Sequence, residues 1–123
     1  MRANLGVVVI VEDDAGMRKS IERLLQAHDY STRAFASAEE YRRATTLDDV
    51  IALVLDIHLD GMSGIELQRR LLAAGSKIPV VFITAHDSEA IRAEALAAGC
   101  VEYLQKPFDA DRLTKALERC QSS

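Results

Sequence analysis

Short apolar runs alternate with helical patterns along this chain. Three runs, GVVVIV at 6–11, VIALVL at 50–55 and VVFIT at 80–84, are continuous and rich in β-branched residues, which is typical of strands buried on both faces. STRAF at 31–35 is more polar and indicates a strand near an edge of the sheet, and VEYL at 101–104 predicts the last strand.

Each predicted strand is followed by a helical pattern, which is clearest where Met17, Ile21 and Leu24 share one face. The predicted helix starts carry capping residues: Asp14, Ser37 with Glu40, Ser63 with Glu66, Asp87 or Ser88, and Asp109. A strand–helix unit that repeats in this way forces parallel pairing with right-handed crossovers. We therefore expect an α/β fold, with an open parallel sheet and helices on both of its faces.

Length and composition indicate one domain, residues 1–123, with an aliphatic core. The net charge of −4 argues against direct binding to nucleic acid or to an anionic membrane, and no apolar run reaches the ~20 residues of a membrane span. Cys100 and Cys120 lack a C-x-x-C spacing, which favours free thiols in a reducing cytoplasm.

Polar side chains follow the predicted strands where the strands end. Glu12 and Asp13 follow the first strand, Asp56 the third, and Lys106 the fifth, while Thr84 ends the fourth. Because open parallel sheets place their sites beyond the carboxyl ends of the strands, these groups should meet. Neighbouring carboxylates stay ionised together only beside a cation, and Mg²⁺ suits hard oxygen ligands. With an ammonium and a hydroxyl added, the set predicts a phosphoryl-transfer site with an aspartate nucleophile.

Four motifs at these strand ends resemble the receiver domain of two-component response regulators. They are VEDD, LDIHLDGMSG, FITAH and YLQKPF, and the resemblance covers the whole chain. FASAEEY and FITAHDSEAIRAEALAAG further resemble receivers of nitrogen-fixation and nodulation regulators. The resemblance implies a flavodoxin-like, doubly wound (βα)5 sandwich of three layers, whose five parallel strands have the order 2-1-3-4-5.

The resemblance also implies the metal and acceptor residues. Asp56 is the phosphoacceptor, and Mg²⁺ is bound by Asp13, by Glu12 through water, by Asp56 and by the backbone carbonyl of His58. The family commonly has aspartate at the position of Glu12, and proline at that of Asp60. We expect metal binding to persist with glutamate at position 12. Without the proline at position 60, we expect the loop after the acceptor to be more flexible.

The phosphate-binding and switch residues implied by the resemblance are Thr84, Lys106 and Tyr103, with a cis peptide between Lys106 and Pro107. Thr84 and Lys106 contact phosphate oxygens, and Tyr103 is the aromatic switch that moves inward with Thr84. His58 and His86 occupy positions where side chains commonly tune the lifetime of the phosphate.

In function, the resemblance implies a phosphorylation-dependent signalling switch that catalyses only its own phosphorylation and dephosphorylation. Its donor is a sensor histidine kinase or a phosphotransfer protein. The signal changes the face formed by the fourth helix, the last strand and the last helix. That face acts on an output domain or partner, or forms a phosphorylation-dependent homodimer. The chain stops at Ser123, so we expect the DNA-binding output domain of such regulators to be absent from it.

Three other functions fit the residues less well. A phosphatase with an aspartyl nucleophile resembles D-x-D, but His58 stands in place of the second aspartate, and this length leaves no room for a cap domain. A flavodoxin-like electron carrier needs a phosphate-cradling loop, whereas VEDDAG is acidic. A degenerate receiver that serves only as an interaction module would not need the complete set of site residues.

Overall fold

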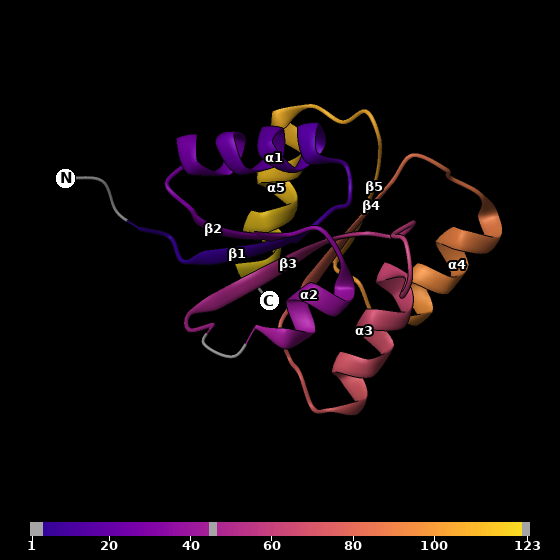
Figure 1. Ribbon diagram of the computed structural model, residues 1–123. Coiled ribbons are helices and arrows are strands. Elements are labelled where there is room, and N and C mark those ends of the chain that lie inside the picture. Colours follow the sequence, from indigo (N-terminus) through magenta and orange to yellow (C-terminus); the bar gives the residue numbers. More distant parts are fainter. Residues whose placement is uncertain (1–3, 45–46, 122–123) are drawn as a thin grey trace.

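The computed structural model describes residues 4–44 and 47–121, over which strands and helices alternate (Figure 1). The strands are β1 (Val7–Val11), β2 (Ser31–Phe35), β3 (Val50–Asp56), β4 (Val80–Thr84) and β5 (Glu102–Gln105). The helices are α1 (Ala15–Ala27), α2 (Ala38–Arg43), α3 (Gly64–Ala73), α4 (Glu89–Ala97) and α5 (Ala110–Gln121). Within this described part, no helix combines the length and the apolar character that crossing a membrane requires.

The five strands form one sheet in the order β2-β1-β3-β4-β5, and every neighbouring pair is parallel. Helices α1 and α5 cover one face, and α2, α3 and α4 cover the other (Figure 1). The predicted flavodoxin-like fold is therefore confirmed. The polar run STRAF forms the edge strand β2, as its composition indicated.

Alternate side chains of the central strands enter two separate apolar layers. In β1, Val8 and Ile10 pack toward α1 and α5, whereas Val9 and Val11 pack toward α2, α3 and α4. These four side chains are fully buried, because helices cover both faces of the sheet. This is why the strand sequence is continuously apolar instead of alternating.

The helix starts follow the capping prediction in part. Ser37 and Ser63 each accept the N–H of the glutamate three residues on, at 3.0 and 3.1 Å. The glutamate side chains do not accept the backbone N–H of the capping serine, which a complete capping box requires. Glu40 accepts the amide of the residue before the cap, and Glu66 pairs with Arg70.

Three strands differ by one residue in extent from the sequence prediction, and β3 continues to Asp56 instead of ending at Leu55. The first begins at Val7 because Gly6 has a φ of +121°, which breaks the extended conformation. The last runs from Glu102 to Gln105, one residue later than expected. This shift brings the end of β5 to the residue directly before Lys106.

Candidate functional site

The register between β1 and β3 brings two carboxylates together. Val11 pairs with Leu55, so Glu12 and Asp56 follow side by side at the carboxyl ends of these strands. Because side chains alternate along a strand, Glu12 and Asp56 face the same side of the sheet as Ile10, toward α1 and α5. Glu12 is 0% exposed and Asp56 is 4% exposed. The strands therefore deliver two buried acids to the same edge of the sheet.

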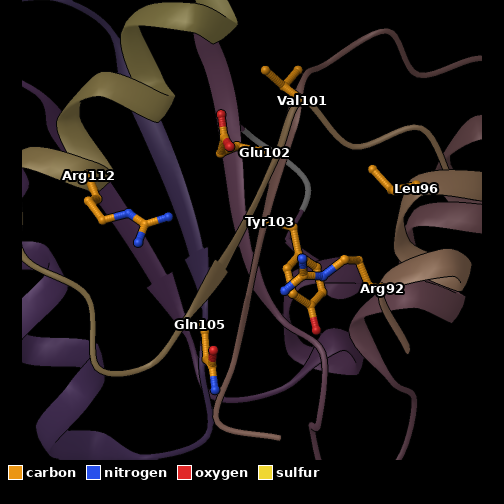
Figure 2. A pocket seen from close by; sticks show the side chains of 7 residues that line it. All are labelled: Arg92, Leu96, Val101, Glu102, Tyr103, Gln105 and Arg112. Carbon is orange, nitrogen blue, oxygen red and sulfur yellow. The ribbon is translucent and has the colours of Figure 1, made fainter. Parts of the chain in front are cut away.

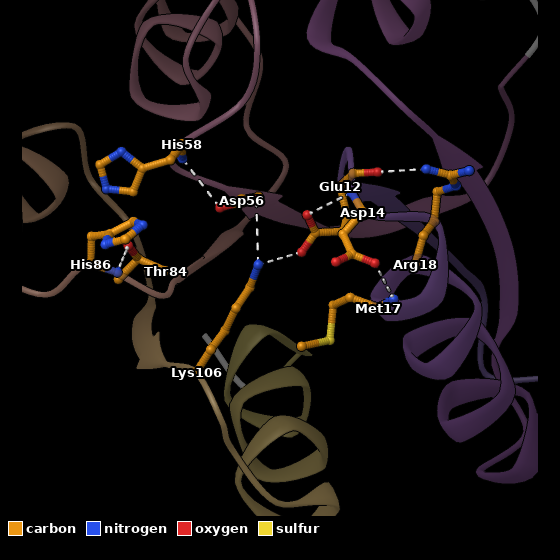
Figure 3. Close-up of polar contacts among 9 residues, drawn as sticks. All are labelled: Glu12, Asp14, Met17, Arg18, Asp56, His58, Thr84, His86 and Lys106. Carbon is orange, nitrogen blue, oxygen red and sulfur yellow. Dashed lines mark hydrogen bonds and ion pairs between the residues drawn. The ribbon is translucent and has the colours of Figure 1, made fainter.

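Lys106 reaches these acids from the loop after β5. Its Nζ lies 2.5 Å from Glu12 Oε1 and 3.4 Å from Asp56 Oδ2 (Figure 3). The other Glu12 oxygen, Oε2, accepts the amide of Asp14 at 3.2 Å. The ammonium thus supplies the positive charge that burial of two carboxylates demands.

Burial dominates the electrostatics of the site. Desolvation, followed by the hydrogen bond and the charge of Asp56, raises the pKa of Glu12 from about 4.5 to about 7, although Lys106 opposes the shift. Burial lowers the pKa of Lys106, but the hydrogen bond to Glu12 and the charges of Asp56 and Glu12 outweigh it, and the net shift is upward. Lys106 therefore remains an ammonium at neutral pH.

Three acids offer a set of hard oxygen ligands. Glu12, Asp13 and Asp56 each present one carboxylate oxygen, and these atoms lie within 4.8 Å of one another. Asp13 is exposed, so the cluster is open to water on its side. Few protein carboxylates together with access to water are what Mg²⁺ prefers, and the residues fit that ion.

The raised pKa of Glu12 predicts how stability depends on pH without a divalent ion. A carboxyl whose pKa is higher in the folded state holds more protons when folded, so stability falls as the pH rises from about 4.5 to about 7. The slope for one proton cannot exceed about 1.4 kcal/mol per pH unit. Glu12→Gln should flatten this dependence in urea unfolding followed by circular dichroism in EDTA. An unchanged slope in this variant, or the same flattening in Glu118→Gln, which changes an exposed glutamate of α5, would contradict the assignment.

The backbone of the acceptor is held by the start of α3. The Gly64 N–H donates to the Ile57 carbonyl at 3.1 Å. A Cβ on Gly64 would lie 2.2 Å from the Asp56 carbonyl oxygen. At the acceptor side chain, the His58 amide donates to Asp56 Oδ1 at 3.1 Å. A glycine is therefore required where the helix meets the acceptor.

The hydroxyls of the predicted switch residues have other partners in this structure. Thr84 is fully buried, and its Oγ1 accepts the His86 N–H at 3.0 Å. The Tyr103 hydroxyl donates to Asp87 at 2.8 Å, and the Arg92 guanidinium lies 5.2 Å from the centre of the Tyr103 ring. Burial, then the bond to Asp87, raises the pKa of Tyr103 to about 12. The hydroxyl of Tyr103 therefore stays protonated and donates.

The remaining predicted positions lie around this rim. The imidazoles of His58 and His86 meet edge to face, with centroids 5.2 Å apart. The Lys106–Pro107 peptide bond is cis. Asp87 and Ser88 were both possible caps of α4. Ser88 is the cap, and Asp87 binds the Tyr103 hydroxyl instead.

Sequence reasoning missed three residues around the site. Arg18 donates to the Glu12 carbonyl at 2.8 Å (Figure 3). Glu39 accepts an amide of the loop after the acceptor, and Gly64 allows the close approach described above. Gly64 ends the motif LDIHLDGMSG, but the motif alone does not indicate the close approach to Asp56. Arg18 and Glu39 each bind backbone outside their own helix, at Glu12 across the turn between β1 and α1 and at Met62 in the loop before α3, and no local sequence pattern indicates such contacts.

Acids and a lysine at the carboxyl edge of a sheet with the order 2-1-3-4-5 are the features expected of a receiver domain. The sequence profile of the response regulator receiver domain matches residues 8–118, and the chain belongs to that family. Receiver domains are the phosphorylation-dependent signalling domains of two-component systems, and are not classical enzymes.

Known relatives refine the assignment. The chain is 37% identical over 111 residues to Nodulation protein W of Bradyrhizobium diazoefficiens, covering 90% of this chain and 49% of that protein. It is 34% identical over 113 residues to the transcriptional regulatory protein FixJ of the same organism, covering 92% and 55%. The crystal structure of FixJ-N matches with a TM-score of 0.86 at 32% identity, covering 99% of this chain and 96% of that chain. The predicted resemblance to nitrogen-fixation and nodulation regulators is confirmed, and the chain spans about half the length of these curated relatives.

Proposed function

We propose that this domain is a phosphorylation switch in a two-component phosphorelay, in which Asp56 accepts a phosphoryl group with Mg²⁺ bound at the acidic cluster. The donor is the phosphohistidine of a sensor histidine kinase or of a phosphotransfer protein. One observation carries the proposal: the ligand oxygens of Glu12, Asp13 and Asp56 lie within 4.8 Å of one another, with the Lys106 ammonium beside two of these acids.

Asp56 is the nucleophile of this step. One of its oxygens attacks phosphorus, the new O–P bond forms as the P–N bond of phosphohistidine breaks, and the departing imidazole nitrogen keeps that electron pair. Lys106 and the Thr84 hydroxyl stabilise the charge on the transferred group. The acids and the His58 carbonyl would hold Mg²⁺, which would supply further neutralisation of charge. In this proposal the domain catalyses its own phosphorylation and dephosphorylation, and no other reaction.

The output of the switch is the face formed by α4, β5 and α5. This face carries a groove of about 410 Å³ between Arg92 and Leu96 of α4, Tyr103 of β5 and Arg112 of α5 (Figure 2). Thr84 turns toward the phosphoryl group and Tyr103 follows it inward, which reshapes the groove. Such a change requires two conformations that differ in their phosphate contacts.

The partners of this face are a DNA-binding output domain or a second receiver in a phosphorylation-dependent homodimer. FixJ, a transcriptional regulatory protein, is the relative that suggests the first. We place the exchange in the cytoplasm, where the cysteine thiols would stay reduced.

If Mg²⁺ binds at the acidic cluster, it should raise the free energy of unfolding and should be required for phosphorylation. Mg²⁺ at about 100 times its Kd should add about 2.7 kcal/mol to the free energy of unfolding, and EDTA should remove the gain. Asp13→Asn should lose most of this gain and most of the Mg²⁺-dependent phosphorylation by acetyl phosphate. Thermal unfolding and intact-protein mass spectrometry measure the two effects.

Asp14→Asn is the matched control for Asp13→Asn. Asp14 carries the same charge one residue further on, but its side chain caps α1 by accepting the Met17 amide at 3.0 Å. Asparagine caps helices as well as aspartate does. A wild-type protein that shows no Mg²⁺ response, or equal losses in both variants, would refute the proposed metal site.

A further inference from the structure

The loop between β3 and α3, residues 57–63, carries groups that the proposed reaction needs. The His58 amide donates to Asp56 Oδ1 at 3.1 Å, and the His58 carbonyl is the proposed metal ligand. Asp60, in the middle of the loop, stands where a proline would have restricted the backbone. The conformation of this segment therefore depends on its contacts with the rest of the fold.

A carboxylate from α2 holds the far end of the loop. Glu39 Oε2 accepts the Met62 N–H at 3.0 Å. A Cβ on Gly61, whose φ is +76°, would lie 2.8 Å from the same oxygen, so the loop backbone passes close against the carboxylate. The Met62 amide is the main cause that lowers the pKa of Glu39. The starts of α2 and α3 lie on the same face of the sheet, which permits this contact (Figure 1).

The loop can transmit this restraint because its two ends are joined. The Gly64 N–H donates to the Ile57 carbonyl at 3.1 Å, which closes the segment on itself. Leu59 is buried and anchors the middle of the segment in the layer beneath α3. A closed segment with a fixed anchor has few ways to move at one end without moving at the other.

We propose that Glu39 is a positioning residue that, through the Met62 amide, fixes the 57–63 loop and with it His58 relative to Asp56. This inference rests on the proposed phosphorylation of Asp56. It adds that the geometry of the metal and acceptor site depends on a carboxylate of α2, which does not touch the reacting atoms.

Glu39→Ala tests the proposal through the Mg²⁺ dependence of phosphorylation by acetyl phosphate. The Mg²⁺ concentration for half-maximal rate should rise about threefold to tenfold, the factor that corresponds to the net loss of one hydrogen bond. Glu39→Gln should restore the wild-type value, because its amide oxygen can still accept the Met62 N–H. Hydrogen exchange should become faster at the Met62 amide in Glu39→Ala and stay slow in Glu39→Gln.

Glu40→Ala is the matched control, because it removes an equal charge from the first turn of the same helix without touching the loop. Its Mg²⁺ dependence should equal that of the wild type. A wild-type response in Glu39→Ala, or a Glu39→Gln as impaired as Glu39→Ala, would overturn the positioning role. If the wild-type protein is not phosphorylated at all, the proposed function fails, while the exchange rate at Met62 still decides whether Glu39 holds the loop.

Discussion

Asp56→Asn is expected to reduce phosphoryl labelling by acetyl phosphate and Mg²⁺ to background. An amide oxygen lacks the charge and the nucleophilicity of a carboxylate oxygen, so the O–P bond cannot form. The fold should remain, because asparagine has nearly the same shape and its oxygen can still accept the His58 amide that now donates to Asp56 Oδ1. Intact-protein mass spectrometry measures the gain of one phosphoryl group directly.

Asp60→Asn is the matched control for this loss. Asp60 is an exposed aspartate on the same loop, four residues after the acceptor, so its substitution should leave labelling intact. Labelling that persists in Asp56→Asn would place the acceptor on another carboxylate of the cluster, with Asp13 the first to test. Such a result would remove the basis of the proposed switch.

Gly64→Ala is expected to destabilise the protein and to impair phosphorylation together. The added Cβ would lie 2.2 Å from the Asp56 carbonyl oxygen and 3.0 Å from the Asp56 carbonyl carbon, so backbone must move. Overpacking of this kind costs about 1–3 kcal/mol, which outweighs the higher helix propensity of alanine. Urea unfolding measures the loss of stability, and the rate of labelling by acetyl phosphate measures the displacement of the acceptor.

Gly16→Ala provides the comparison, because Gly16 also lies in the first turn of a helix. Its Cβ would meet only Asp14 Oδ1, at 3.4 Å, which is an ordinary contact. This variant should be neutral or more stable by up to about 1 kcal/mol, and should be labelled at the wild-type rate. Equal destabilisation of Gly16→Ala and Gly64→Ala would mean that the close approach to Asp56 has no special importance.

The layout of the sheet could be predicted from the sequence because the governing rules are local. Continuous apolar runs mark strands covered on both faces, and alternation with helices leaves parallel pairing as the only solution. The same rule places whatever follows each strand at one edge. For this reason the sequence alone predicts that Glu12, Asp56 and Lys106 lie close together, and hydrogen bonds join them in the structure.

Contacts between elements that are distant in sequence could not be predicted in the same way. The pairing of Glu39 with the Met62 amide spans 23 residues and depends on how α2 lies against the loop. Similarly, the capping-box pattern at Glu66 assumed a local partner, but Arg70 one turn later offered an opposite charge. Where several partners compete for one side chain, only the assembled fold decides among them.

The ammonium of Lys106 gives the acidic pocket a counterion that belongs to the chain itself. Its effective concentration at Glu12 and Asp56 is set by the fold and not by the surrounding salt. Folding therefore need not wait for a divalent ion to be captured, in contrast to small domains that are unfolded without their metal. In the proposed switch, Mg²⁺ would therefore bind to a pocket whose negative charge Lys106 already offsets in part.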